Sequence, residues 1–313
     1  MKLAPIELLQ IGTDLKSGDY LVKCKEVYIP IRYNRGRGNN VVISFHGAIN
    51  RDRFQIPKFQ TVIPPIDDCH QIKVADPTLS LGESLSMGWF IGGEGMPLQK
   101  RLAELLEYLS AKLNFTRRIY VGGSAGGFAA LFYSWSDPGS VCIAINPQVD
   151  LKVYSRNQIS KYMTVAWPSR NELADAECCI SSDLPKLYES SFENFVIYLQ
   201  STGDYKHFER QLPRFCRVGF KNARKFILQC NYWGIPDHGS SVPVSAYSTW
   251  VRAVLVASSL ERQSILDCYS VLNGQELKGA IEGKKELREH PWGAEKEKAD
   301  LLRDYLLSQQ SEG

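Results

Sequence analysis

The sequence predicts an α/β protein whose central sheet is mostly parallel and carries helices on both faces. Short apolar runs typical of buried strands alternate along the chain with longer segments of helical periodicity, the pattern that builds such a sheet. Residues 41–45, Val-Val-Ile-Ser-Phe, form a nearly continuous apolar run of the kind found in strands buried on both faces. With 313 residues, of which 44% are hydrophobic, the chain is long enough to bury a sizeable core.

The first half of the chain contains three strand regions and one clear helix. Residues 20–33 alternate apolar and polar side chains and predict one or two edge strands near Pro30, because proline suits an edge. The run 41–45 predicts a central strand, and residues 71–75 a further short one. Residues 97–113 predict a helix, since leucines recur at a spacing of three or four on one face. These leucines are Leu98, Leu102, Leu105, Leu106, Leu109 and Leu113.

The second half continues the alternation except between about residues 150 and 190. A helix is predicted over 125–135. Further strands are predicted by the apolar runs 118–121, 141–145, 195–199 and 226–230. In the segment 150–190 the alternation lapses, and we expect an inserted cap or lid that shapes a substrate pocket. A peripheral helical packing element is the alternative for this segment.

The C-terminal segment differs in composition from the rest. From about residue 272 onward the chain is strongly charged, and a final amphipathic helix is predicted by Leu301, Leu302, Tyr305 and Leu306. We therefore expect residues 1–271 to form the main domain and residues 272–313 to form a charged helical appendage at its surface. An oligomer contact is the alternative role for the appendage.

The overall charge and the cysteines exclude several classes of protein. The formal net charge is +3 and basic residues are interspersed with acidic ones, so we expect no nucleic-acid partner. The eight cysteines form no C-x-x-C pair and no zinc spacing. No apolar run reaches membrane-spanning length or forms a signal core. We therefore expect a cytoplasmic protein with reduced cysteines and no membrane span.

The most informative motif is Val-Gly-Gly-Ser-Ala-Gly-Gly at residues 121–127, which contains a G-x-S-x-G pattern at Gly122, Ser124 and Gly126. It lies between a predicted strand and a predicted helix. A serine at such a sharp turn has a strained backbone and an exposed hydroxyl, so its close neighbours must lack side chains. The helix N-terminus also directs N–H groups at a developing negative charge. The motif therefore indicates an activated serine nucleophile, with an ordinary glycine-rich turn as the alternative.

The other groups that acyl transfer requires follow further predicted strands. The carboxyl ends of parallel strands meet at one edge of the sheet, where ligands bind. His46-Gly47-Ala48 follows the strand 41–45 and can offer a main-chain N–H to an oxyanion, as can the N–H of Ala125. Asp204 follows the strand 195–199, and His238 follows the strand 226–230. The nucleophile, acid and base thus occur in the order Ser, Asp, His.

These separated motifs resemble the α/β-hydrolase superfamily over roughly residues 20–258. The resemblance implies an α/β-hydrolase fold with a catalytic triad of Ser124, Asp204 and His238. The implied oxyanion hole is formed by Gly47, Ala48 and Ala125. The chain departs from common forms of the motif at Gly123, where a bulkier residue often stands. More loosely, residues 122–131 and Asn146-Pro147-Gln148 are similar to proteins of bacterial surface-glycan modification, including O-acetyltransferases.

Alternatives remain open for the acid and for the pocket. Asp150, after the strand 141–145, is the second candidate for the triad acid, whereas Asp237 is expected to shape the loop before His238. Substrate-pocket residues are expected among histidines and aromatic residues near the strand ends. These are His46, Trp89, Tyr205, His207 and Trp233.

The predicted function is that of a serine esterase or O-acyltransferase that acts on a small or carbohydrate-linked acyl group. A serine peptidase of the same fold and a non-catalytic binding or assembly protein are the alternatives. No metal and no organic cofactor is expected, because the sequence has no H-x-x-x-H pair and no glycine-rich phosphate loop. The oligomeric state is not predicted.

Overall fold

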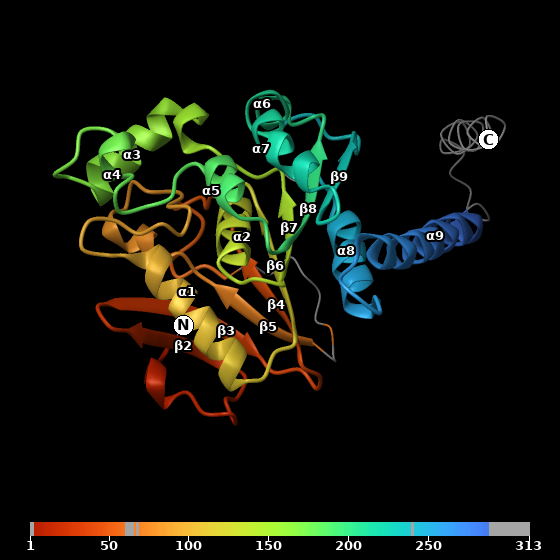
Figure 1. Ribbon diagram of the computed structural model, residues 1–313, viewed down its shortest axis with the longest axis horizontal. Helices are drawn as coiled ribbons and strands as arrows, with labels where there is room; N and C mark the ends of the chain where they lie inside the picture. Colours follow the sequence, from red (N-terminus) through yellow and green to blue (C-terminus); the bar gives the residue numbers. More distant parts are fainter. Residues whose placement is uncertain (1–2, 60–65, 67–68, 239–240, 288–313) are drawn as a thin grey trace. The chain divides into compact units, whose positions relative to one another are not determined.

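The protein is described by a computed structural model that covers residues 3–59, 66, 69–238 and 241–287 (Figure 1). The chain divides into two compact units, Met1–Tyr269 and Ser270–Gly313. The first unit holds the sheet, and the described part of the second consists of the C-terminal turns of helix α9 (Arg262–Leu287). The amphipathic helix predicted around residues 301–306 lies outside the described residues.

The described residues form a sheet of nine strands in the order β1-β2-β3-β5-β4-β6-β7-β8-β9. From β5 across to β9 every neighbouring pair is parallel, as predicted, whereas β3 pairs antiparallel with both β2 and β5. The strands are β1 (Ala4–Glu7), β2 (Gly18–Cys24), β3 (Val27–Asn34), β4 (Asn40–Phe45), β5 (Cys69–Val74), β6 (Arg117–Gly123), β7 (Val141–Ile145), β8 (Phe195–Ser201) and β9 (Phe226–Asn231).

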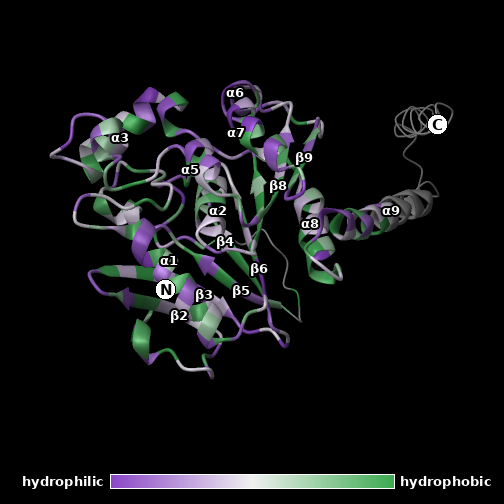
Figure 2. Cartoon of the chain, in the orientation of Figure 1, coloured by the Kyte–Doolittle hydropathy of each residue, from purple (hydrophilic) through white to green (hydrophobic). Residues whose placement is uncertain are grey.

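The two faces of the sheet pack on different helices. One face, which we call the α2 face, shares a core with α1, α2, α5 and α7. The other, the α8 face, packs on α8 and the first turns of α9. Side chains alternate between these cores, so that Tyr120 lies in the first and Val121 in the second. Figure 2 shows β8 as largely hydrophobic, as expected of a strand covered on both faces.

The helices follow the predicted positions closely in the first unit. Those predicted over 97–113 and 125–135 are α1 (Leu98–Lys112) and α2 (Ala125–Trp135). The remaining α-helices are α3 (Arg156–Ala166), α4 (Leu173–Ala176), α5 (Leu184–Ser190), α6 (Tyr205–Arg210), α7 (Leu212–Gly219) and α8 (Val244–Val256). Short 3-10 turns are Leu8–Gln10, Pro77–Leu81, Leu151–Val153 and Phe220–Asn222. No helix of the described residues is both long and apolar enough to cross a membrane.

One expectation about the sheet edge is corrected. Residues 20–33 do form two strands, β2 and β3, but neither lies at the edge. The edge is β1, which runs parallel to β2 with Ala4 opposite Tyr20. Pro30 is accommodated inside β3 because its carbonyl accepts a hydrogen bond from the N–H of Ala75 and a proline needs no acceptor for its nitrogen. Between β7 and β8 the chain forms the turn 151–153 and helices α3 to α5; a lid role for this segment stays a prediction.

Candidate active site

Ser124 stands at the sharp turn between β6 and α2. Its backbone has φ 57° and ψ −119°, a region that costs a non-glycine residue about 1–3 kcal/mol. The turn is fixed on both sides, because the N–H of Ser124 donates to the carbonyl of Ile145 (2.9 Å) and its carbonyl accepts from the N–H of Phe128 (3.1 Å). These bonds hold the strained residue at the carboxyl edge of the sheet, beside the N-terminus of α2.

The predicted elbow glycines are required by close packing. A Cβ atom on Gly122 would lie 2.1 Å from the carbonyl oxygen of Gly126. A Cβ atom on Gly126 would lie 2.4 Å from the carbonyl oxygen of Phe45, on the neighbouring strand β4. Both contacts are with backbone atoms, which cannot rotate away. The helix can therefore approach the sheet behind Ser124 only because both positions lack a side chain.

Asp204 lies between two imidazole rings. It is 1% exposed, just beyond β8, and its side chain caps α6 through the N–H of His207. Nδ1–H of His207 donates to one carboxylate oxygen (2.9 Å), and Nδ1–H of His238 donates to the other. Burial by itself would raise the pKa of the Asp204 carboxyl, but the two imidazole hydrogen bonds outweigh it, so the pKa lies well below its usual range. The carboxylate is therefore a charged acceptor that fixes the orientation of both rings.

The same three side chains are close enough together to form a candidate metal site. Asp204, His207 and His238 each offer a ligand atom, and these atoms lie within 4.8 Å of one another. The two rings, however, are stacked with centroids 4.1 Å apart and planes within 12°. Ring nitrogens bind an ion in the ring plane, and two stacked planes do not meet at one point. In this arrangement the rings fit two separate carboxylate oxygens rather than a shared ion.

Gln148, just after β7, links Ser124 to this histidine pair. Its Oε1 accepts a hydrogen bond from the indole N–H of Trp89, which can only donate. The amide nitrogen must therefore face the opposite way, where it donates to Oγ of Ser124 (2.9 Å) and to Nε2 of His207 (3.3 Å). Burial lowers the pKa of His207, in agreement with a neutral ring that accepts at Nε2. Because Gln148 donates to Oγ, the hydroxyl proton of Ser124 is left free to be donated to a base.

The loop that carries His238 is tied to the end of β7. The side-chain amide of Asn146 donates to the hydroxyl of Ser241 (2.8 Å), and its oxygen accepts from the N–H of Ser201 (2.7 Å). Asp237, which was expected to shape this loop, accepts the N–H of His238 and has a positive φ of 87°. Neither the contact of Gln148 with Ser124 nor the role of Asn146 was predicted from the sequence. The signals for both were their place at a strand end and the looser resemblance carried by Asn146-Pro147-Gln148.

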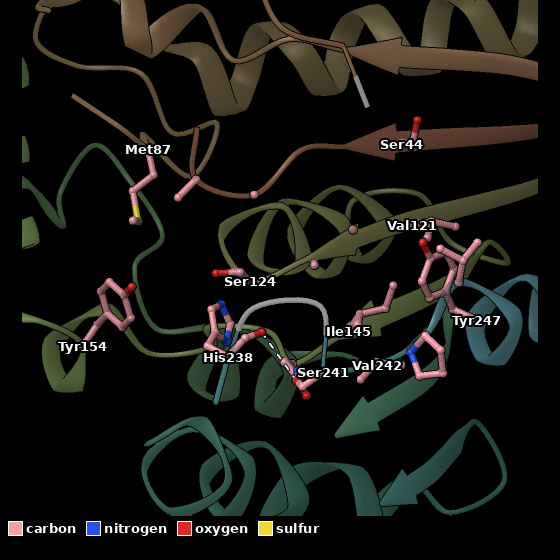
Figure 3. A pocket seen from close by; sticks show the side chains of 17 residues that line it. Ser44, Met87, Val121, Ser124, Ile145, Tyr154, His238, Ser241, Val242 and Tyr247 are labelled. Carbon is pink, nitrogen blue, oxygen red and sulfur yellow. Dashed lines mark hydrogen bonds between the residues drawn. The ribbon is translucent and has the colours of Figure 1, made fainter. Parts of the chain in front are cut away.

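A cavity of about 520 Å³ opens at this edge of the sheet (Figure 3). Ser124 and His238 both line it, as do Gly47 and Ala48. A Cβ atom on Gly47 would lie 3.6 Å from Cβ of Ser124, so the predicted oxyanion turn is next to the serine. Ala125 is buried at the first position of α2, where helix N–H groups have no intrahelical acceptor. In Figure 3 the cavity extends to both sides of Ser124, toward Met87 and Tyr154 and toward Val121, Val242 and Tyr247.

The residues expected to line the pocket lie elsewhere. His46 is buried and braces the oxyanion turn: its Nδ1–H donates to the carbonyl of Gly47 (2.7 Å) and its Nε2 accepts from the N–H of Asp76 (3.1 Å). Burial lowers the pKa of His46, which favours the neutral ring that these two bonds need. His46 is thus a structural neighbour of the cavity and not part of its wall.

The other four expected pocket residues lie outside the wall of this cavity for different reasons. Trp89 is fully buried, since its indole packs inward and bonds with Gln148. Tyr205 is 63% exposed on α6. His207 lies behind His238, against Asp204, and Trp233 packs partly buried against the core of the α8 face. None of the four lines the cavity at Ser124.

Asp150, the second candidate for the acid, has other partners. One oxygen accepts from Nη1 of Arg214 (2.9 Å) and the other from the N–H of Lys152 (2.9 Å). It therefore caps the turn after β7, and the carboxylate that contacts His238 is that of Asp204.

Comparisons with known proteins bear on the fold. No protein-family model and no curated protein sequence matches the chain. Among solved structures, the capsule O-acetyltransferase of Neisseria meningitidis serogroup A is similar over 76% of this chain and 94% of its own, with a TM-score of 0.56 and 14% identity. An acylaminoacyl peptidase of Pyrococcus horikoshii is similar over 81% of this chain and 45% of its own (TM-score 0.53, 14% identity). A 2,6-dihydroxy-pseudo-oxynicotine hydrolase is similar over 77% of this chain and 68% of its own (TM-score 0.50, 16% identity). Together with the parallel strand order and the serine turn between β6 and α2, these likenesses show that the chain has the α/β-hydrolase fold.

Proposed function

We propose that this protein is a serine-dependent enzyme of acyl transfer that acts on an acyl ester. One observation carries the proposal: the strained Ser124 lines the same cavity as His238, whose ring is oriented by the buried Asp204. A serine, an imidazole and a carboxylate in these relations are the groups that nucleophilic acyl transfer uses. The hydrogen bond from Gln148 to Oγ supports it further, because it leaves the hydroxyl proton for the base.

In the proposed reaction Oγ of Ser124 attacks the ester carbonyl carbon as His238 accepts the hydroxyl proton at Nε2. Main-chain N–H groups of Ala125 and of the Gly47-Ala48 turn stabilise the oxyanion. When the tetrahedral intermediate collapses, the bond to the leaving alcohol breaks and His238 returns the proton to that oxygen. Water or a second alcohol then attacks the acyl-enzyme by the same proton path and releases the serine. Asp204 stabilises the imidazolium that forms in each half of the reaction.

The acyl acceptor is the finer part of the proposal. Water as acceptor makes the protein an esterase, and a hydroxyl as acceptor makes it an O-acyltransferase. We include a carbohydrate hydroxyl among the acceptors, since the fold is shared with a capsule O-acetyltransferase. The cytoplasm stays the predicted location, on the argument from the cysteine pattern.

The test is covalent labelling. Wild-type protein, Ser124→Ala and Ser190→Ala, which changes an exposed serine outside the cavity, are incubated with a fluorophosphonate, and the intact masses are measured. We expect one adduct on the wild type and on Ser190→Ala and none on Ser124→Ala. A folded wild-type protein that gains no adduct would refute the proposal and favour a binding protein. Parallel assays with acetyl esters and with peptidyl amides separate an esterase from a peptidase.

A further inference from the structure

The cavity continues from Ser124 along the α8 face of the sheet. The strand register places Ser44 of β4 opposite Val121 of β6, and Gly123 of β6 opposite Ile145 of β7. Val121 belongs to the core of the α8 face and Ile145 packs against it, so alternation puts all four residues on that face. All four also line the cavity. They form a floor that begins directly beside the serine.

The opposite wall comes from the start of α8 and the residues before it. Val242, Pro243, Val244 and Tyr247 line the same cavity, and Val242 and Tyr247 belong to the core of the α8 face. Figure 3 shows Val121, Val242 and Tyr247 on one side of Ser124, away from Met87 and Tyr154. We call the part lined by Val121, Gly123, Ile145, Val242 and Tyr247 the acyl chamber. Its lining is mostly apolar; the polar side chains beside it are Ser44, Ser241 and the hydroxyl of Tyr247, and the amide nitrogen of Asn146 donates to Ser241.

Gly123 keeps the chamber open next to the nucleophile. Unlike Gly122 and Gly126, it has room for a side chain: a Cβ atom there would meet only Ile145, at 3.6 and 3.8 Å. Its φ lies outside the positive range, so an L residue could adopt the same backbone. A side chain at this position would lie on the cavity side of β6, between Ser124 and Val121. Backbone strain therefore does not require glycine here, whereas an open path from Ser124 does.

We propose that the acyl chamber binds the hydrocarbon chain of the acyl group, so that the substrate is an ester or thioester of a straight-chain apolar acid longer than acetate. This inference rests on the proposed function, in which Ser124 accepts the acyl group. The whole cavity, about 520 Å³, falls within the range of about 300–1,000 Å³ for small-molecule sites and exceeds what an acetyl group fills. An acyl chain attached to Oγ can enter the chamber over Gly123, while the part lined by Met87 and Tyr154 is left for the alcohol.

The experiment compares chain-length profiles. Values of kcat/KM are measured for the p-nitrophenyl esters of acetate, butyrate, hexanoate and octanoate with wild type, Gly123→Ala and Gly123→Val. Gly18→Val is the matched control, because Gly18 lies in β2 outside the cavity and a Cβ there makes ordinary contacts at 3.4 Å or more. For wild type and Gly18→Val we expect kcat/KM to rise about fourfold per buried methylene. For Gly123→Val we expect the octanoate-to-acetate ratio to fall at least tenfold, with Gly123→Ala between the two.

A binding measurement separates this inference from the proposed function. Sodium octanoate and sodium acetate are titrated into wild type and Gly123→Val by calorimetry, which needs no catalysis. Octanoate binding that Gly123→Val weakens about tenfold or more supports the chamber, even if no ester is cleaved and no fluorophosphonate adduct forms. In that case only the catalytic proposal fails. Conversely, an adduct on Ser124 with acetate as the best ester, or a chain-length profile that Gly123→Val leaves unchanged, overturns the chamber and leaves the acyl-transfer proposal intact.

Discussion

Gln148→Met is the substitution that tests the proposed site most directly. Methionine is unbranched and similar in length to glutamine, so it keeps the packing after β7 while it removes the amide. Three groups lose a partner: the hydroxyl of Ser124, Nε2 of His207 and the indole N–H of Trp89. The protein should still fold, with a Ser124 hydroxyl that has lost its N–H donor.

The magnitudes follow from these bonds. Trp89 is fully buried, and a buried donor without an acceptor costs about 1–3 kcal/mol, so we expect the free energy of unfolding to fall by that amount. Oγ of Ser124 gains negative charge as its proton leaves. A hydrogen bond to a charged group contributes about 1.5–3 kcal/mol, so we expect the rate of fluorophosphonate labelling to fall about 10- to 100-fold.

Trp89→Phe is the companion variant: it removes the N–H that orients the amide, together with the second ring of the indole, and leaves Gln148 in place. Phenylalanine keeps an aromatic ring beside Tyr154 and Tyr162, which contact the indole edge-on. We expect a smaller loss of labelling than for Gln148→Met, and no additional loss in the double variant, since the indole acts through the amide. Labelling rates are compared in a buffer without urea. A urea unfolding curve first shows that each variant is folded in that buffer. A folded Gln148→Met protein that labels at the wild-type rate would refute the assigned role of the amide.

Three further predictions address the acid, the turn and the second imidazole. Asp204→Asn should lower ester kcat/KM by about 10³–10⁴-fold, because an amide cannot accept from both rings; wild-type turnover would refute the assignment of the acid. Gly122→Ala should prevent folding, since its Cβ would lie 2.1 Å from the carbonyl oxygen of Gly126; a native circular dichroism spectrum and melting temperature would contradict this. Burial lowers the pKa of His207, so below pH ~6.5 the unfolded chain binds more protons than the folded one. The free energy of unfolding should therefore fall as pH drops from 7.5 to 5.5, by at most ~1.4 kcal/mol per pH unit for this group. The fall should be less steep in His207→Gln. Equal slopes for the two proteins in urea titrations would exclude His207 as a source of the pH dependence.

The sequence predicted the parallel part of the sheet because buried parallel strands have a strong signal. Runs such as 41–45 and 195–199 are almost entirely apolar, and they are β4, in the middle of the sheet, and β8, an inner strand next to the edge strand β9. The prediction that residues 20–33 form the edge of the sheet was wrong for the converse reason. β1, Ala-Pro-Ile-Glu, is short and mostly exposed, and its pairing with β2 depends on tertiary contacts that leave no periodicity in four residues.

The candidate site was predictable only where position in the sheet decides it. Strand ends at one edge of a parallel sheet must lie near each other, which is why the sequence could predict that Asp204 and His238 lie close together. Their catalytic roles stay predictions. None of the five expected pocket residues lines the cavity at Ser124, because the direction of a side chain depends on local backbone. Trp89 has a positive φ of 52°, and its ring turns into the core, which composition cannot reveal.

The tripeptide Asn146-Pro147-Gln148 explains how one short loop can hold both halves of the proposed site. Asn146 ties down the loop of His238 through Ser241, and Gln148 contacts Ser124 directly. Pro147 lies between them against α2, where a Cβ on Gly127 would come within 2.7 Å of the proline ring. Because these residues are consecutive and the proline fixes one backbone angle, a displacement of the loop moves the supports of the base and of the nucleophile together. The supports of Ser124 and of the segment that carries His238 therefore both lie at the end of β7, a strand that contributes no member of the proposed triad.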